Sequence, residues 1–205
     1  MFDGLNRDLS QRFWQGLARP LARSGITPNQ VTWIGLVLVL GNCAAYVRFQ
    51  QNFWFGLGLI LSFSFDGLDG AVARLTGKSS KYGGYLDAVV DRYQEIAVYF
   101  AIAYVNGWWA LAFLAMSGSL LISYNKASTA MEIPIDNHGW PDLLERFERI
   151  FIICAVLVLD PIIPVPSFLG GSLLLAGVVV IAVLAHVTAV QRFLRARAML
   201  KSRKD

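Results

Sequence analysis

The sequence predicts an all-α membrane protein: a bundle of six transmembrane helices that follows an amphipathic helix on the membrane surface. Of the 205 residues, 56% are hydrophobic and 16% are charged, whereas an average soluble domain has about 25% charged residues. Apolar windows of about 20 residues, the length that crosses the hydrocarbon layer, can be drawn six times along the chain. We therefore expect one integral-membrane domain over residues 1–205.

Residues 1–30 are predicted to form the amphipathic juxtamembrane segment. Its apolar side chains recur every three or four positions between Arg and Asp residues, which is the pattern of a helix lying in the membrane interface. They are Phe2, Leu5, Leu9, Phe13, Leu17 and Leu21. Pro28 and Asn29 then predict a turn into the first span.

Residues 31–191 are predicted to form the six-helix bundle, and residues 192–205 a basic tail. The spans are expected at 31–48, 53–73, 84–105, 108–130, 145–164 and 168–191. Most Lys and Arg residues fall before the first span, after the sixth, or in the second and fourth connectors. Because positive residues favour the cytoplasmic side, this predicts a multi-pass cell-membrane protein whose termini and active site are cytoplasmic. The positive charge suits anionic lipid headgroups, and without a nucleic-acid motif we expect no nucleic-acid partner.

Four aspartates lie within the second and third spans, where an ionised carboxylate costs at least about 2.5 kcal/mol. Asp66 and Asp69 are three positions apart, and Asp87 and Asp91 are four apart, so each pair shares one helix face. The two spans form an antiparallel hairpin, in which the first acid stands opposite the last and the middle two face each other. We expect the four carboxylates to converge in a cavity open to the cytoplasm.

Such a cluster needs a cation, because like charges at close range oppose one another's ionisation. An all-oxygen ligand set suits Mg²⁺ or Mn²⁺, and this many ligands predicts two ions. The absence of nearby Cys or His argues against zinc.

Glycines and one arginine are interleaved with the acids. Gly70 and Gly83 flank the predicted site, which indicates close approach of a ligand to the backbone. For Gly67 and Gly84, close helix packing is an equally good explanation. Arg74 lies one turn beyond Gly70 and is either a topology charge or a diphosphate clamp.

The pattern Asp66-x2-Asp69-Gly70-x2-Ala73-Arg74-x8-Gly83-x3-Asp87-x3-Asp91 resembles the signature of the CDP-alcohol phosphotransferase family, also called CDP-alcohol phosphatidyltransferases. The resemblance implies transfer of a phosphatidyl-type group from a CDP-linked lipid, CDP-diacylglycerol or CDP-archaeol, to an alcohol with release of CMP. It also implies a role in phospholipid biosynthesis and a homodimer.

The resemblance further assigns roles to the motif residues. Asp91 is the implied general base, and the implied metal ligands are Asp66, Asp69, Asp87 and Asp91. The implied nucleotide-binding residues are Asp69, Gly70, Ala73, Arg74 and Gly83.

Two further segments bear on the alcohol acceptor. "SYNKAS" and "LLERFERIFII" resemble family members that use inositol phosphate, which implies a basic acceptor site of Lys126, Arg146 and either Arg192 or Arg195. Glycerol-3-phosphate and serine are the alternative acceptors. Arg149 is four residues from Glu145, the spacing of an ordinary ion pair on a helix surface.

Two other classes place acids in a membrane: intramembrane prenyltransferases and cation transporters. A prenyltransferase carries its acidic motifs on separated helices, and a transporter distributes acids along the whole crossing. Here all four acids lie on one hairpin and the opposite halves of the spans are nearly uncharged. The pattern therefore favours the CDP-alcohol enzyme.

Overall fold

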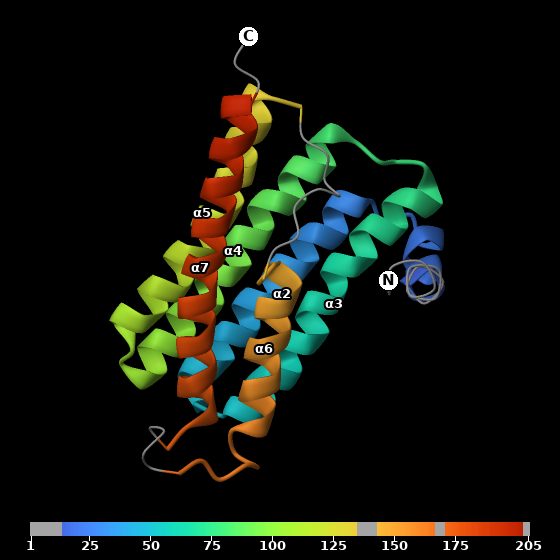
Figure 1. The fold of residues 1–205 in the computed structure, drawn as a ribbon. Helices are drawn as coiled ribbons and strands as arrows, with labels where there is room; N and C mark the ends of the chain where they lie inside the picture. The colour runs from blue at the N-terminus through green and yellow to red at the C-terminus, as the bar shows by residue number, and fades with distance from the viewer. Residues whose placement is uncertain (1–13, 135–142, 167–170, 203–205) are drawn as a thin grey trace.

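The computed structural model describes residues 14–134, 143–166 and 171–202, and these residues form helices and turns without any strand. A helical stretch over residues 14–23 comes first. The helices that follow are α2 (Pro28–Phe49), α3 (Asn52–Thr76), α4 (Lys81–Asn106), α5 (Trp109–Glu132), α6 (Arg146–Leu159) and α7 (Leu173–Ser202), as Figure 1 shows. The predicted all-α helical bundle is confirmed.

Three of these helices, α2, α3 and α7, are long and apolar enough to cross a membrane. Helices α4 and α5 have 26 and 24 residues, but charged side chains lie within α4, and the last part of α5, residues 123–132, is mostly polar. Helix α6 has 14 residues, fewer than the roughly 20 that a crossing needs. Six crossings and a cytoplasmic orientation therefore stay predictions.

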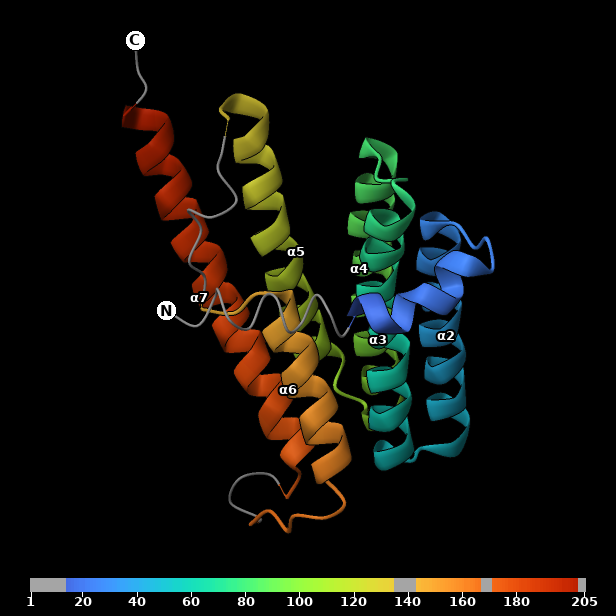
Figure 2. The ribbon, with the colours of Figure 1, turned by 90° about the vertical axis from the view of Figure 1, so that its right-hand side faces the viewer.

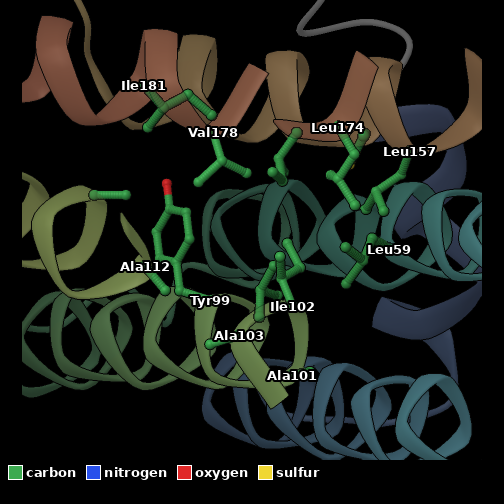
Figure 3. Close-up of a cluster of buried hydrophobic side chains, with 14 of the residues drawn as sticks. Leu59, Tyr99, Ala101, Ile102, Ala103, Ala112, Leu157, Leu174, Val178 and Ile181 are labelled. Atoms are coloured by element: carbon green, nitrogen blue, oxygen red, sulfur yellow. The ribbon is translucent and has the colours of Figure 1, made fainter. Parts of the chain in front are cut away.

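The helices form two groups, with α2, α3 and α4 on one side and α5, α6 and α7 on the other (Figure 2). Contacts of α3 with α6 and of α4 with α5 join the groups. Between them lies the main apolar core, where Leu59, Ile102, Leu157 and Leu174 pack together (Figure 3). A Cβ at Gly56 would lie only 2.9 Å from Leu157 Cβ, so a glycine is needed where α3 meets α6.

A tight turn between α3 and α4 places the acidic segments of these two helices side by side. Gly77 ends α3 in the left-handed region with φ 65°, a conformation that favours glycine. Ser80 caps α4, because its Oγ accepts a hydrogen bond from the Gly83 backbone N–H at 2.9 Å. The chain therefore reverses direction within a few residues, and the acidic segments of α3 and α4 come to face each other.

The N-terminal helical stretch lies crosswise over α3 (Figure 2). Its Trp14 ring rests on Gly67, where an added Cβ would lie 3.2 Å from the ring carbons. Ala18 is fully buried beside it, whereas Leu17 is exposed. Gly67 therefore serves helix packing, one of its two predicted roles. Of the predicted apolar stripe, Phe2, Leu5, Leu9 and Phe13 lie outside the described residues.

The ends of α6 and α7 differ from the predicted spans 145–164 and 168–191. Asp160 follows the last residue of α6, and its Oδ1 accepts hydrogen bonds from Ser172 Oγ and the Leu174 backbone N–H, both at 2.9 Å. These hydrogen bonds tie the end of α6 to the start of α7, and the residues that follow Leu159 form the loop between the two helices. At the other end, α7 continues to Ser202, so the described part of the predicted basic tail is helical.

Candidate active site

Two cavities adjoin the acidic hairpin, and Asp87 lines both. The first has a volume of about 230 Å³ and is bordered mainly by polar residues and glycines of α3, α4 and the start of α2. The second, of about 630 Å³, is bordered mainly by apolar side chains of the N-terminal stretch, α3 and α6. Asp66 and Arg146 also line this second cavity. We call them the polar cavity and the apolar cavity.

The polar cavity contains all five residues of the predicted nucleotide site: Asp69, Gly70, Ala73, Arg74 and Gly83. Asp69 is buried, and its Oδ2 accepts a hydrogen bond of 2.6 Å from Thr32 Oγ1 of α2. The Arg74 side chain folds back along α3, since an added Cβ at Gly70 would lie 3.4 Å from its Nη1. Gly84 also lines the cavity, and a Cβ there would meet nothing within 4 Å. Gly84 thus leaves room in the cavity and does not pack against another helix.

Two of the other predicted acids, Asp66 and Asp91, meet Arg146 at the first turn of α6. Its Nη2 lies 2.7 Å from Asp66 Oδ2 and 2.8 Å from Asp91 Oδ1. The same nitrogen donates to Gln94 Oε1 at 2.8 Å, and Gln94 Nε2 donates to Asp66 Oδ1 at 3.1 Å. Arg146, predicted to bind the acceptor, is therefore joined to two predicted metal ligands.

One of the close contacts of Arg146, the one with Asp91, is not a hydrogen bond. Despite the 2.8 Å separation, the direction from Arg146 Nη2 to Asp91 Oδ1 does not suit a hydrogen bond, so this contact is an ion pair only. Asp91 Oδ1 and Arg146 Nε are both buried, and neither has a hydrogen-bond partner among the described residues. Both carboxylates thus face one guanidinium, and the hydrogen bonding of Asp91 is incomplete.

The expected convergence of four carboxylates is not found in this arrangement. In the described part of the chain, no three Asp, Glu, His or Cys side chains form a group that could hold a metal ion as they stand. Asp69 bonds to Thr32 in the polar cavity, while Asp66 and Asp91 bracket the guanidinium of Arg146. The donor set still fits a hard divalent cation, since it consists of carboxylate oxygens, one of them buried without a hydrogen bond.

A second buried charge cluster lies directly beyond the site. Arg149, 1% exposed, donates from Nε and Nη2 to Glu95 Oε1 at 3.0 and 2.8 Å. Glu95 Oε2 accepts from Ser119 Oγ at 2.6 Å and from Arg92 Nη1 at 3.2 Å. Arg92 Nη2 is also 3.7 Å from Asp91 Oδ2. The predicted pairing of Arg149 with Glu145 is wrong, because the long-range partner Glu95 holds this side chain in the interior.

The remaining predicted acceptor residues lie on α5 and α7. Arg192 is buried and donates from Nη1 to the Ile122 carbonyl at 2.7 Å. Lys126 follows Ile122 by one turn on α5, and Arg195 follows Arg192 on α7; both side chains are half-buried. Arg192 thus helps to join these two helices, and an acceptor role for the three residues stays a prediction.

Three residues near the acids were not anticipated: Thr32, Gly35 and Gln94. A Cβ at Gly35 would lie 3.2 Å from Asp66 Oδ1, so the absence of a side chain at this position of α2 leaves room for the Asp66 carboxylate. Gln94 is completely buried, and its position three residues after Asp91 is the signal that could have identified it. No comparable sequence signal marks Thr32 or Gly35, which come from a different helix.

Comparison with known proteins gives a consistent result. Residues 25–190 match the model of the CDP-alcohol phosphatidyltransferase family. The archaetidylinositol phosphate synthase of Pyrococcus horikoshii is 34% identical over 188 residues, which are 90% of this chain and 91% of that protein.

Solved structures show the same likeness. The crystal structure of Mycobacterium tuberculosis phosphatidylinositol phosphate synthase with CDP-DAG bound superposes with a TM-score of 0.78 at 26% identity, covering 90% of this chain and 94% of that one. The same enzyme in complex with manganese and citrate gives a TM-score of 0.77 at 27% identity, covering 89% and 88%.

Proposed function

The chain belongs to the CDP-alcohol phosphatidyltransferase family, and from that premise we propose that it transfers a phosphatidyl-type group from a CDP-linked lipid to inositol phosphate and releases CMP. The donor is CDP-archaeol or CDP-diacylglycerol. A divalent cation, Mg²⁺ or Mn²⁺, is the cofactor.

The observation that carries this proposal is that the polar and apolar cavities share Asp87. A CDP-linked lipid has a nucleotide at one end, acyl or isoprenoid chains at the other, and a diphosphate between them. The polar cavity, with glycines and Arg74, suits the nucleotide. The apolar cavity, lined by Phe63, Phe147 and Phe151, suits the chains. The diphosphate would then lie next to the acids.

The reaction joins the acceptor hydroxyl oxygen to the phosphorus that carries the lipid and breaks the bond from that phosphorus to the CMP oxygen. The hydroxyl proton must leave as the new bond forms, and Asp91 is the proposed base that receives it. Its Oδ1 has no hydrogen bond to hold it in place. When bound, the cation, held by Asp66, Asp69, Asp87 and Asp91, supplies positive charge to the diphosphate oxygens and the departing CMP.

The acceptor is proposed to be inositol phosphate because the relatives that resemble the chain over most of its length bear inositol phosphate synthase names. Basic side chains on α5, α6 and α7 could bind the phosphate of such an acceptor: Lys126, Arg146, Arg192 and Arg195. The homodimer also stays a proposal.

The test uses purified protein in lipid nanodiscs with Mg²⁺. CDP-archaeol and CDP-diacylglycerol are each combined with inositol phosphate, glycerol-3-phosphate or serine, while CMP release and the lipid product are measured. We expect turnover with inositol phosphate, and its loss with excess chelator and recovery on adding Mg²⁺. Turnover with serine or glycerol-3-phosphate alone would contradict the proposed acceptor, and full turnover with chelator would contradict the cofactor.

A further inference from the structure

One nitrogen atom in the acidic site meets three oxygen atoms. Arg146 Nη2 lies 2.7 to 2.8 Å from Asp66 Oδ2, Gln94 Oε1 and Asp91 Oδ1. An arginine Nη carries two hydrogens, so it cannot serve three acceptors, and Asp91 Oδ1 is the oxygen left without a hydrogen bond. Three oxygens gathered around one positive centre make an arrangement that a spherical cation would satisfy better than a planar guanidinium.

We propose that Arg146 is an exchangeable internal counter-cation. Its single positive charge offsets part of the negative charge of Asp66 and Asp91 while no divalent ion is bound, and the side chain leaves these acids when an ion binds. Gln94 Oε1 then becomes an additional neutral oxygen available to the ion. This inference rests on the proposed function in one respect, namely that the acids take a divalent cation.

The contacts of Arg146 favour exchange over coexistence. A guanidinium binds a carboxylate best through two parallel N–H bonds, but Arg146 reaches both acids through Nη2 alone, and its buried Nε has no partner among the described residues. A divalent ion at the same oxygens would also repel the guanidinium at short range. Arg146 is therefore held by charge more than by geometry, and a stronger charge can replace it.

The structure also offers the displaced side chain a place to go. Arg146 lines the apolar cavity of about 630 Å³, and its guanidinium carbon lies 5.7 Å from the centroid of the Phe63 ring, within the range of a cation–π contact. Its side chain is already 22% exposed. If the Arg146 guanidinium leaves the acids, it therefore does not have to enter a closed apolar interior.

Arg149, one turn further along α6, provides a natural contrast. It binds Glu95 through two nitrogens and the Leu144 carbonyl through the third, and it is 1% exposed, so each of its nitrogens has a partner. A divalent ion at Asp66 and Asp91 should leave Arg149 where it is. The two arginines of one helix thus have different predicted responses to the same ion.

The first experiment measures this difference directly in the wild-type protein. The full chain in nanodiscs is treated briefly with phenylglyoxal, which modifies accessible guanidinium groups, with and without Mn²⁺. Mass spectrometry then gives the modified fraction of each arginine. We expect modification of Arg146 to rise several-fold with Mn²⁺ and that of Arg149 to stay low in both samples. Unchanged modification of Arg146 at a saturating level of bound Mn²⁺ would overturn the proposal.

The second experiment measures Mn²⁺ binding by the electron paramagnetic resonance of the free ion. Because Mn²⁺ must compete with the guanidinium, Arg146→Gln should bind Mn²⁺ about tenfold more tightly than the wild type, the equivalent of removing a partly exposed ion pair with two acids. Arg48→Gln, a charge change at an exposed position in the last turn of α2, should leave the affinity near the wild-type value. Weaker binding by Arg146→Gln would overturn the proposal.

The outcomes separate this inference from the proposed function. If the wild type binds no Mn²⁺, the cofactor part of the proposed function and the exchange both fail. If Mn²⁺ binds and Arg146→Gln tightens it while phenylglyoxal modification does not change, Arg146 only repels the ion from a fixed position. In that case the exchange is wrong and the proposed function stands.

Discussion

Helices α3 and α6 run antiparallel, and each end of their contact holds an acidic centre with a different design. At one end, Asp160 accepts hydrogen bonds from Ser172 and Leu174 at Oδ1 and from Asn52 Nδ2 at Oδ2, at 2.8 to 2.9 Å. At the other end, Asp66 and Asp91 share one nitrogen of Arg146, and a buried oxygen is left unbonded. Asn52 and Asp66 are 14 positions apart on α3, about 21 Å along the helix.

The difference indicates what each end does. Neutral donors satisfy both oxygens of Asp160, so its negative charge is stabilised without a cation and the connection between α6 and α7 is held in place. Asp66 and Asp91 instead share the guanidinium of Arg146, which cannot bond to all its neighbours, and a second guanidinium, that of Arg92, lies 3.7 Å from Asp91. A fully bonded acid is suited to structure, and an incompletely bonded one is suited to chemistry. The predictions below test this contrast between the Asp160 end and the Asp91 end.

The largest expected effect is that of Asp91→Asn on turnover. Removing a positioned general base lowers the rate by about 10²- to 10⁴-fold, and the isosteric amide keeps the volume of the side chain. CMP release per folded protein is the measurement. Asp160→Asn is the matched control, which should lose stability while its turnover stays near the wild-type value. An Asp91→Asn enzyme with wild-type turnover would remove this residue from the mechanism.

The buried pair between Arg149 and Glu95 should give the largest effect on stability. Arg149→Ala leaves the Glu95 carboxylate, which is 6% exposed, without the guanidinium that donates two hydrogen bonds to its Oε1, and breaking such a buried pair costs about 3 to 5 kcal/mol. Thermal unfolding in detergent would show the loss.

A double variant tests whether charge is the cause. Arg149→Met combined with Glu95→Leu removes both buried charges and keeps similar volume, so it should recover much of the stability. If the double variant is less stable than Arg149→Ala, the network with Arg92 and Ser119 matters more than the pair itself.

Local patterns in the sequence were enough to predict the hairpin. The spacing of Asp66, Asp69, Asp87 and Asp91 on two adjacent helices follows from helix geometry and a short turn. Gly77 and Ser80 then form that turn with the backbone conformations that their residue types favour. For this reason the two halves of the motif border one cavity, as the sequence suggested.

The positions of the arginines could not be predicted in the same way. Arg146 and Arg149 meet acids about 50 or more positions earlier in the chain, and the packing of α6 against α3 decides which acid each one reaches. Spacing within α6 suggested Glu145 as the partner of Arg149, but a buried arginine needs a buried acid, and Glu95 supplies it. Gln94 lies one turn after Asp91, which marks its helix face, but only the packing of α3 and α6 beside α4 shows that it bonds Asp66 and Arg146.

A smaller change is expected from Asp160→Ala. It leaves Asn52 Nδ2, Ser172 Oγ and the Leu174 N–H without their common acceptor. Because these groups are only partly buried and water can replace some bonds, we expect a loss of about 1 to 3 kcal/mol. Chemical denaturation monitored by tryptophan fluorescence would measure it. A large drop in the turnover of Asp160→Ala per folded molecule would contradict the view that the Asp160 end serves structure and the Asp91 end serves chemistry.

The smallest expected effect compares two glycines on the active-site end, Gly84 and Gly67. Gly84 lines the polar cavity and an added Cβ there meets nothing within 4 Å, whereas one at Gly67 lies 3.2 Å from the Trp14 ring. Gly84→Ala should therefore unfold at the wild-type temperature and raise the KM for the CDP-linked lipid about tenfold, the lower end of the effect of one carbon in a binding pocket. Gly67→Ala should lower the unfolding temperature instead, because Trp14 must move. A loss of stability in Gly84→Ala with an unchanged KM would mean that this glycine serves packing after all.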